Sequence, residues 1–311
     1  MARLFPRNLM EFERQFRTEE GCRDYLVQVR WPEGFRCPRC GHGQGWLLAR
    51  GTWRCGDCRA MVSATAGTIF HRSHLSLRLW FRAIWWVTNQ KTGLSALGLQ
   101  RALGLGSYRT AWMCLHKLRR AMVRPNREQL SGKVEVDEIY IGGRRKGRGQ
   151  GPGLGMTHNS KSMVATAVEV RDKGMGRLRF QIIPRRSHDQ LTRFVKQAVA
   201  PASTIVTDGW FPYTHVKDSG YIHEPRPGRG ETPESEPLLP RVHRVAALLK
   251  RWLLGVHQGR VSREHLPHYL EEFAFRFNRR LSSHRGQLFY RLVQQACVVD
   301  PHPYDRLRIS N

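Results

Sequence analysis

Apolar residues recur every three or four positions between residues 74 and 122, and this spacing predicts helices. We expect helices at 76–89, 94–103 and 108–122, with a glycine-containing turn at 104–107. A helix, a turn and a helix capped by Ser107 form a helix-turn-helix, whose second helix would present Arg109 to base edges. A small helical bundle would give the same pattern. The basic side chains of Arg119 and Arg120 favour the DNA-binding interpretation.

From residue 132 the pattern changes to alternating apolar positions and β-branched residues, which predict strands. The expected elements are strands at 133–142, 161–170, 176–184, 203–207 and 221–224, a helix at 189–199, and a long helix beginning near His243. The order β-β-β-α-β-α is that of the ribonuclease H-like fold. Residues 131–311 are therefore predicted to form one α/β domain of this kind.

Two acidic residues, Asp137 and Asp208, fall on the first and fourth of the main strands of this domain, which are neighbours at the centre of a ribonuclease H-like sheet. Two such carboxylates can hold two Mg²⁺ ions for phosphoryl transfer. An arginine partner for Asp137, or an ordinary Asp-Gly turn at Asp208, would explain either residue alone. Glu135 shares a strand face with Asp137 and is an auxiliary at best, whereas Glu138 points to the other face.

Four cysteines near the N-terminus, Cys37, Cys40, Cys55 and Cys58, form two CxxC pairs separated by fourteen residues. This spacing predicts a structural zinc site with four thiolate ligands, flanked by short strands at 46–50 and 52–54 in a zinc-ribbon layout. Disulfide pairing or accidental spacing is the alternative. With four cysteines present, His42 is not needed as a ligand.

The charge of the chain indicates a polyanionic partner. Lysine and arginine number 52 against 25 acidic residues, a net charge of +27, and the excess is shared between residues 1–130 (22 basic, 8 acidic) and 131–311 (30 basic, 17 acidic). Nucleic acid is the expected class of partner. A glycine-rich insert carries Arg144, Arg145 and Lys146, and we expect it to act as a mobile clamp on the DNA backbone.

No stretch of the sequence approaches the roughly 20 apolar residues that span a bilayer, and the N-terminal residues lack the pattern of a signal peptide. The cysteine usage fits a reducing compartment. We therefore expect no membrane partner and a cytoplasmic, nucleoid-associated protein. The predicted organisation is multidomain α+β: 1–70, an N-terminal helix and zinc ribbon; 71–130, a helix-turn-helix-like segment; 131–311, the ribonuclease H-like domain.

The motifs together resemble insertion-sequence transposases of the DDE superfamily, of the ISXO-type group with an N-terminal zinc ribbon. The matching residues are the two CxxC pairs, Val134-Glu-Val-Asp-Glu-Ile-Tyr-Ile-Gly-Gly143, Thr207-Asp-Gly209, Leu249-Lys-Arg-Trp252 with Gly255, and the segment 265–280 containing Glu-Glu-Phe-Ala-Phe-Arg-Phe-Asn-Arg-Arg. The resemblance implies a ribonuclease H-like core, Mg²⁺ dependence, and DNA cleavage and strand transfer at terminal inverted repeats.

The resemblance also implies a third metal ligand seven residues before Lys250, and that position is His243 rather than a carboxylate. A neutral imidazole suits Mn²⁺ better than Mg²⁺. We favour His243 over Glu271 or Glu272; the latter fits an ion pair with Arg276 on its own helix. Lys250 lies two helical turns from His243, on the same face, where it would contact a phosphate.

The leading hypothesis is a transposase in which Asp137, Asp208 and His243 hold two Mg²⁺ or Mn²⁺ ions. Its partners would be double-stranded DNA, as terminal inverted repeats and target, and further copies of the chain in a homodimer or higher oligomer. A catalytically inactive zinc-ribbon DNA-binding regulator and a structure-specific nuclease on the same core are the alternatives. Further DNA contacts are expected from Arg251, Arg276, Arg279 and Arg280.

Overall fold

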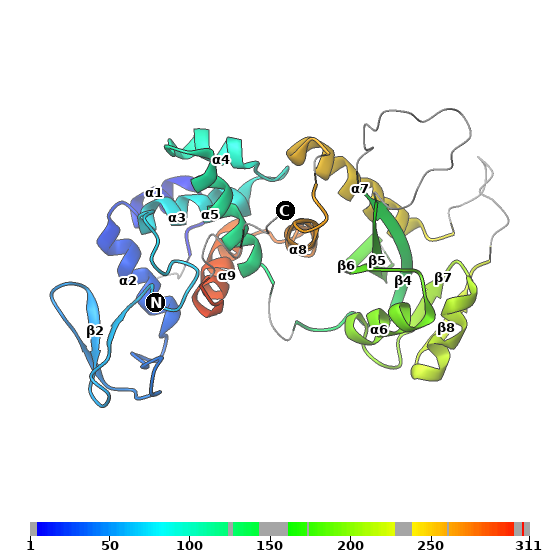
Figure 1. Ribbon diagram of the computed structural model, residues 1–311, viewed down its shortest axis with the longest axis horizontal. Coiled ribbons are helices and arrows are strands. Elements are labelled where there is room, and N and C mark those ends of the chain that lie inside the picture. Colours follow the sequence, from blue (N-terminus) through cyan, green and yellow to red (C-terminus); the bar gives the residue numbers. More distant parts are fainter. Residues whose placement is uncertain are drawn as a thin grey trace. The chain divides into compact units, whose positions relative to one another are not determined.

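The computed structural model describes residues 5–123, 127–142, 161–172, 174–227, 238–259, 261–301 and Leu307. The chain divides into two compact units, one within residues 1–124 and 281–311 and the other within 125–280. Figure 1 shows the elements of both units, coloured along the sequence. Among the described residues, no helix is long and apolar enough to cross a membrane.

Unit 1 consists of helices and one small sheet. Its helices are α1 (Leu9–Gln15), α2 (Glu19–Arg30), α3 (Leu77–Asn89), α4 (Ala96–Leu103), α5 (Tyr108–Ala121) and α9 (Arg285–Val298). Five of them begin at a side chain that accepts a backbone N–H of the first turn, namely Asn8, Thr18, Ser76, Ser95 and Ser107. Each such cap stabilises its helix by about 1 kcal/mol. The predicted helices at 76–89, 94–103 and 108–122 are thereby confirmed to within two residues.

The last helix, α9, belongs to unit 1, although the sequence placed 281–311 in the catalytic domain. Phe289 of α9 is fully buried, and its ring lies 5.5 Å from that of Phe12 and 5.6 Å from that of Phe81. Helix α9 packs against α2, α3 and α5. The predicted boundary is wrong because aromatic side chains distant in sequence bury one another, which periodicity along the chain does not reveal. The same packing joins 1–70 and 71–123 in one unit.

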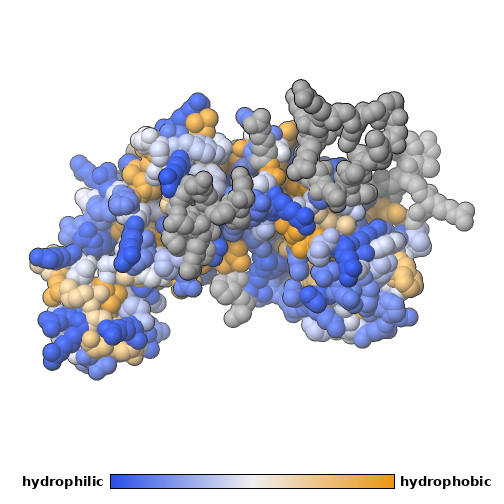
Figure 2. Space-filling model, in the orientation of Figure 1, coloured by the Kyte–Doolittle hydropathy of each residue, from blue (hydrophilic) through white to orange (hydrophobic). Residues whose placement is uncertain are grey.

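The zinc ribbon is a three-stranded antiparallel sheet of β1 (Gly45–Leu47), β2 (Thr52–Cys55) and β3 (Met61–Ser63). The sequence predicted the first two strands and missed the third. In the register, Trp46 pairs with Arg54 and Arg54 with Met61, so the three side chains share one face. Trp46 and Met61 are 51% and 58% exposed, and Figure 2 shows hydrophobic residues at the surface of the ribbon, at the lower left.

Helices α4 and α5 lie where the helix-turn-helix prediction placed its two helices. They pack against each other, and the turn between them begins at Gly104, whose left-handed backbone (φ 62°, ψ 35°) ends α4. Tyr108 and Arg109, in the first turn of α5, are exposed. The start of α5 is therefore accessible, as the recognition helix of such a motif has to be.

Unit 2 is built on a five-stranded sheet in the order β6-β5-β4-β7-β8. Its elements are β4 (Lys133–Ile141), β5 (Ser162–Arg171), β6 (Gly174–Ile183), α6 (His188–Ala198), β7 (Thr204–Thr207), the 3₁₀ helix η2 (Phe211–Ser219), β8 (Ile222–Pro225), α7 (Pro240–His257) and α8 (Leu266–Phe277). Strands β6, β5 and β4 are antiparallel neighbours, whereas β4, β7 and β8 run parallel. This is the ribonuclease H-like arrangement that the order of the elements predicted.

The sheet is covered on both faces, so unit 2 has three layers (Figure 1). One core holds Ile139 and Val206 with apolar residues of α7 and α8; the other holds Val136 and Ile205 with residues of α6 and η2. Because side chains alternate along a strand, odd-numbered residues of β4 face α7 and even-numbered residues face η2.

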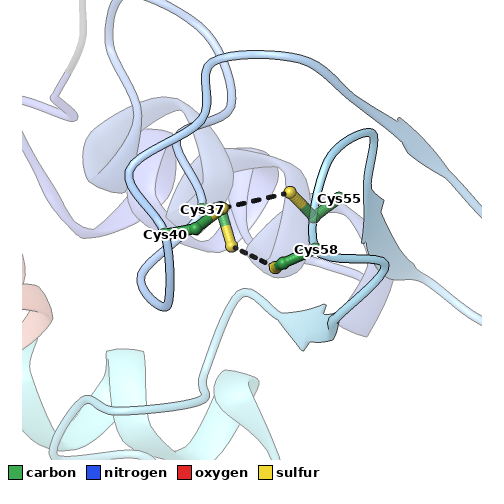
Figure 3. A group of neighbouring side chains, drawn as sticks. All are labelled: Cys37, Cys40, Cys55 and Cys58. Atoms are coloured by element: carbon green, nitrogen blue, oxygen red, sulfur yellow. Dashed lines mark hydrogen bonds between the residues drawn. The ribbon is translucent and has the colours of Figure 1, made fainter.

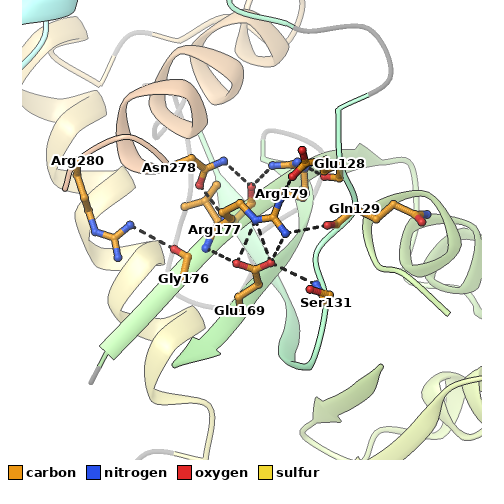
Figure 4. Close-up of polar contacts among 10 residues, drawn as sticks. Glu128, Gln129, Ser131, Glu169, Gly176, Arg177, Arg179, Asn278 and Arg280 are labelled. Atoms are coloured by element: carbon orange, nitrogen blue, oxygen red, sulfur yellow. Dashed lines mark hydrogen bonds and ion pairs between the residues drawn. The ribbon is translucent and has the colours of Figure 1, made fainter. Parts of the chain in front are cut away.

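A polar network ties β5 and β6 to the segment that precedes β4 (Figure 4). Glu169 of β5, whose side chain is 8% exposed, pairs with Arg177 of β6 at 2.6 Å and accepts the backbone N–H of Arg177 and of Ser131. Arg179, 7% exposed, donates to the carbonyl oxygen of Glu128 at 2.6 Å. All of these contacts lie within unit 2.

Two residues just after α8 satisfy the backbone of β6, the first strand of the sheet order. Asn278 accepts the N–H of Leu178 at 2.8 Å and donates to its carbonyl oxygen at 3.1 Å, as a neighbouring strand would. Arg280 donates to the carbonyl oxygens of Gly176 and Met175. An uncovered edge strand would be a template for pairing with other chains, so these contacts protect the sheet.

Candidate active site and zinc centre

The four cysteines gather as predicted. Their Sγ atoms all lie within 4.8 Å of one another; Cys37 and Cys58 are 3.7 Å apart, and Cys40 and Cys55 are 3.6 Å apart (Figure 3). Four thiolates about 2.3 Å from a tetrahedral zinc are about 3.8 Å from one another, so the group fits the ion. A backbone N–H of Cys40 favours the thiolate of Cys37 and lowers its pKa to about 7.

The acidic site begins with Asp137 in the middle of β4 and Asp208 directly after β7. The two strands are parallel neighbours in the sheet. Asp208 accepts the backbone N–H of Trp210 at 3.0 Å, and Gly209 between them has φ 78°, a left-handed conformation that glycine adopts without strain. Asp208 is thus held by a tight turn at the end of a central strand, as the turn explanation of the Asp-Gly pair predicted, and its role as a metal ligand stays a prediction.

His243 reaches the same place from α7. Its Nε2 lies 3.6 Å from Oδ2 of Asp137, and its side chain is 43% exposed. Helix α7 is placed by Glu135, whose buried carboxylate accepts the N–H groups of Arg241 and Val242 at 2.7 and 3.0 Å. Glu135 therefore orients the first turn of α7, which carries His243, and this role was not foreseen.

Both alternative third acids lie on α8. Glu271 forms a two-pronged ion pair with Arg127, at 2.6 and 3.0 Å, and Glu272 is 1% exposed. Helix α8 packs on β6, two strands away from β4. By contrast, His243 lies next to Asp137, which supports our preference for it.

Sequence reasoning missed a second group of residues around the acidic site. Arg186, in the loop between β6 and α6, pairs with Asp208 at 2.9 Å and with Glu138 at 2.5 Å, and its guanidinium lies 3.8 Å from the ring centre of Trp210. Tyr213 of η2 donates to the other oxygen of Glu138. Glu138 does point away from α7, as the alternation predicted. Its partner Arg186, however, also pairs with Asp208. Arg186 follows another arginine in a polar loop, and no sequence pattern distinguishes the two.

The pKa values of two carboxylates in the site are raised. Burial, together with the nearby Asp208, raises the pKa of Asp137, although the backbone N–H of Glu138, His243 and Arg186 oppose the shift. Burial also raises the pKa of Glu138 to about 7. Carboxylate and imidazole are suitable ligands for a divalent cation of the Mn²⁺ type, so the donor set fits. Of the described residues, only the cysteine group already holds three or more ligand atoms within 4.8 Å.

The predicted DNA-contacting residues fall into four classes. Arg109, Lys250 and Arg251 are exposed, and Arg120 is partly buried. Arg119 is 2% exposed, so its prediction as a surface contact is wrong: α5 turns this side of its last turns into the core of unit 1. Arg144, Arg145 and Lys146 lie outside the described residues.

Three arginines of the segment 276–280 are partly buried. Arg279 and Arg280 lie over the rings of Phe275 and Phe277, at 4.1 and 3.9 Å. Arg280 in addition binds the backbone of β6, as described above. The sequence did not predict this structural role, and the DNA contacts of Arg276, Arg279 and Arg280 stay predictions.

Two known proteins show similarity to large parts of the chain. A protein of Halobacterium salinarum, described as an uncharacterized protein in transposable element ISH50, is 27% identical over 278 residues, covering 84% of this chain and 91% of that protein. The catalytic core domain of BIV integrase aligns with 18% identity and a TM-score of 0.29, covering 46% of this chain and 81% of the integrase chain.

Two separate segments of the chain, one in the ribbon and one in the sheet domain, each match a known protein family. Residues 17–61 match the transposase zinc-ribbon domain, and residues 129–278 match the ISXO2-like transposase domain. The second match contains Asp137, Asp208 and His243 and ends at Asn278. The chain thus joins a region that matches the transposase zinc-ribbon domain to a region that matches the ISXO2-like transposase domain.

Proposed function

We propose that this protein is an insertion-sequence transposase that binds the terminal inverted repeats of its element and catalyses metal-dependent DNA cleavage and strand transfer. The observation that carries the proposal is the pair Asp137 and Asp208, presented by two neighbouring parallel strands with His243 beside the first. Divalent ions bound there would activate an attacking water or 3′ hydroxyl and stabilise the leaving oxygen. We propose two Mg²⁺ or Mn²⁺ ions in this role and one structural zinc in the ribbon.

The side chains of the protein position the reacting groups. Asp137 and Asp208 would hold the cations, and His243 would supply a neutral nitrogen ligand where an acidic residue would add a negative charge. Lys250, exposed two turns further along α7, would contact a phosphate next to the scissile bond. No serine or tyrosine nucleophile is invoked, so in-line attack at phosphorus proceeds without a covalent protein intermediate.

DNA binding is assigned to unit 1 and to exposed basic residues of unit 2. The exposed first turn of α5, with Arg109, supports base contacts in the major groove. On the ribbon, Arg54 lies between the exposed side chains of Trp46 and Met61, a combination that suits a phosphate and an adjacent sugar or base. Two DNA ends have to be held together for strand transfer, so we propose a homodimer or higher oligomer on DNA.

The test is cleavage of DNA carrying the terminal repeat, in Mg²⁺ and in Mn²⁺. We expect Asp137→Asn and Asp208→Asn to lower the cleavage rate by more than about a thousandfold, because metal ions supply several kcal/mol of transition-state stabilisation. DNA binding should persist in both variants. Asp189→Asn, an exposed aspartate of α6, is the matched control and should cleave normally.

Two results would contradict this proposal in different ways. A wild-type protein that binds the repeat but never cleaves would indicate a DNA-binding regulator, and cleavage of branched DNA without an end sequence would indicate a structure-specific nuclease. The third ligand is tested by His243→Ala and Glu272→Gln. If His243→Ala cleaves normally while a folded Glu272→Gln variant is inactive, His243 is not the ligand.

A further inference from the structure

Arg186 holds a position in the acidic site that the proposed reaction does not yet use. It is the residue that connects Asp208, at the end of β7, with Glu138, on the η2 side of β4. Its side chain is 28% exposed, so water and ions reach it, whereas that of Glu138 is 2% exposed. A role for Arg186 in metal binding rests on the proposed function, because it concerns the same metal ions.

The contacts leave neither oxygen of Asp208 unoccupied in this conformation. Oδ1 accepts the N–H of Trp210 at 3.0 Å, and Oδ2 contacts Nη2 of Arg186 at 2.9 Å. A divalent ion that binds Asp208 through Oδ2 therefore meets the guanidinium at the same oxygen. Two cations at one carboxylate oxygen repel each other, so one contact weakens as the other forms.

The contacts of Arg186 with the rest of the protein are of a different kind. Glu138 is buried, and Tyr213 already donates to its Oε1, which leaves Oε2 for Arg186. A buried carboxylate that loses its cation is strongly destabilising, so this contact has to persist. Stacking on Trp210 adds a second attachment for the guanidinium. Of the contacts that Arg186 makes with Glu138, Trp210 and Asp208, the one with Asp208 therefore costs the least free energy to break.

We propose that Arg186 is a resident cation of the acidic site, which neutralises Asp208 before metal binds and sets the metal concentration at which the site loads. Metal binding exchanges the Arg186 contact at Asp208 for a metal contact, while Glu138, Tyr213 and Trp210 keep the guanidinium nearby. Arg186 is thus a positioning residue that acts through Asp208, and Glu138 is its anchor.

The exchange predicts opposite effects for two substitutions in a direct measurement of Mn²⁺ binding by electron paramagnetic resonance, made on the full zinc-loaded chain without DNA. Arg186→Met removes the competitor and should tighten Mn²⁺ binding about five- to tenfold, the size of one partly exposed charge pair. Glu138→Gln removes the anchoring charge, leaves Asp208 as the partner of Arg186, and should weaken binding by a similar factor.

The double variant Glu138→Gln/Arg186→Met separates this exchange from the simple loss of a nearby negative charge. Once Arg186 is gone, Glu138→Gln should have a much smaller effect on Mn²⁺ affinity. The double variant also avoids a buried unpaired carboxylate, so it remains informative if Arg186→Met alone folds poorly: it should bind Mn²⁺ more tightly than Glu138→Gln. Arg185→Met, at the exposed neighbouring arginine, is the matched control and should leave the affinity unchanged.

The outcomes distinguish the exchange from the proposed function. The proposed metal site is wrong if the wild-type protein binds no Mn²⁺, or if Asp208→Asn does not abolish the binding. If Asp208→Asn abolishes binding but Arg186→Met leaves the affinity unchanged or lowers it, the metal site stands and the exchange is overturned. Equal weakening by Arg186→Met and Glu138→Gln would assign Arg186 a purely structural role.

Discussion

Unit 2 contains two carboxylate clusters in which the protein shifts the pKa values in opposite directions. In the cluster around Glu169, burial raises the pKa, but hydrogen bonds from the side chain and backbone of Arg177 outweigh it, and the pKa of Glu169 is lowered. In the cluster around Asp208, burial prevails, and the pKa values of Asp137 and Glu138 are raised. The first cluster has enough donors for its charge, and the second has too few.

This difference fits a structural role for the first cluster and the proposed metal-binding role for the second. Glu169 joins two strands and the segment before β4 through hydrogen bonds with Arg177 and Ser131 (Figure 4). In the acidic site, Glu138 and Asp208 share the guanidinium of Arg186, whose charge also acts on Asp137. Carboxylates left short of positive charge stabilise a cation that arrives later, which is the property that a metal site requires.

The largest expected effect is on stability, at Glu169. Glu169→Ala should lower the free energy of unfolding by about 2–4 kcal/mol, because it leaves two backbone N–H groups without their acceptor and removes the buried ion-pair partner of Arg177. Urea unfolding followed by tryptophan fluorescence measures the change. Glu169→Gln keeps an acceptor and should cost about half as much. A loss below about 0.5 kcal/mol for Glu169→Ala would remove the contrast between the clusters.

The two clusters should also respond to pH with opposite signs. The folded pKa of Glu138 lies above its ordinary value, so the folded state binds the extra proton between pH 4.5 and about 7, and the stability from this group is lost as pH rises through that window. The loss is at most about 3 kcal/mol. The pKa of Glu169 is lowered, so its contribution is present above pH 4.5 and is lost as pH falls.

Unfolding of the full chain at a series of pH values tests this sign. The free energy of unfolding of wild type minus that of Glu138→Gln should decline from pH 4.5 to 7. The corresponding difference between wild type and Glu169→Gln should rise with pH. Parallel slopes for the two differences would mean that burial does not dominate at Glu138.

A divalent metal should stabilise one cluster only. Mn²⁺ at about one hundred times its dissociation constant should add about 2.7 kcal/mol to the free energy of unfolding, because it binds the folded state alone. Asp208→Asn should abolish this gain, and Glu169→Gln should retain it. Equal gains in the two variants would place the bound ion elsewhere.

The smallest expected effect is that of Asp208→Asn without metal. Removing one of several crowded carboxylates relieves repulsion and costs one ion pair with Arg186, so the free energy of unfolding should change by less than about 1 kcal/mol. Urea unfolding of Asp208→Asn and of Glu169→Ala in the same buffer compares the two changes in the free energy of unfolding. A loss as large as that of Glu169→Ala would make Asp208 a structural residue as well.

The parts of the fold that depend on residues close together along the chain were predictable from the sequence. Ser76 and Ser107 cap helices where the pattern placed them, and the strands around Asp137 and Asp208 follow their alternation to within two residues. The two CxxC pairs each bring two thiols close together within four residues, so the group of four cysteines was also foreseen. In each case a few consecutive residues carry the physical cause.

The remainder depends on contacts between distant segments. Arg186 reaches the acidic site from a polar loop, and Glu135 caps a helix that begins 105 residues later at Pro240. Asn278 mimics a strand only because α8 ends beside β6. Arg119 looks like a surface cation in the sequence, but α5 turns it inward. Such pairings follow from three-dimensional packing, and the order of charges along the chain does not reveal them.

The return of the chain to unit 1 has a consequence for how the protein is made. Phe289 closes an aromatic core whose other members, including Phe12 and Phe81, are synthesised before the whole of unit 2. On the ribosome, the first unit therefore stays open until the acidic site has already been translated. A chain that stops at residue 280 has every residue of that site and lacks the helix that completes its N-terminal partner, so premature termination yields no finished N-terminal unit.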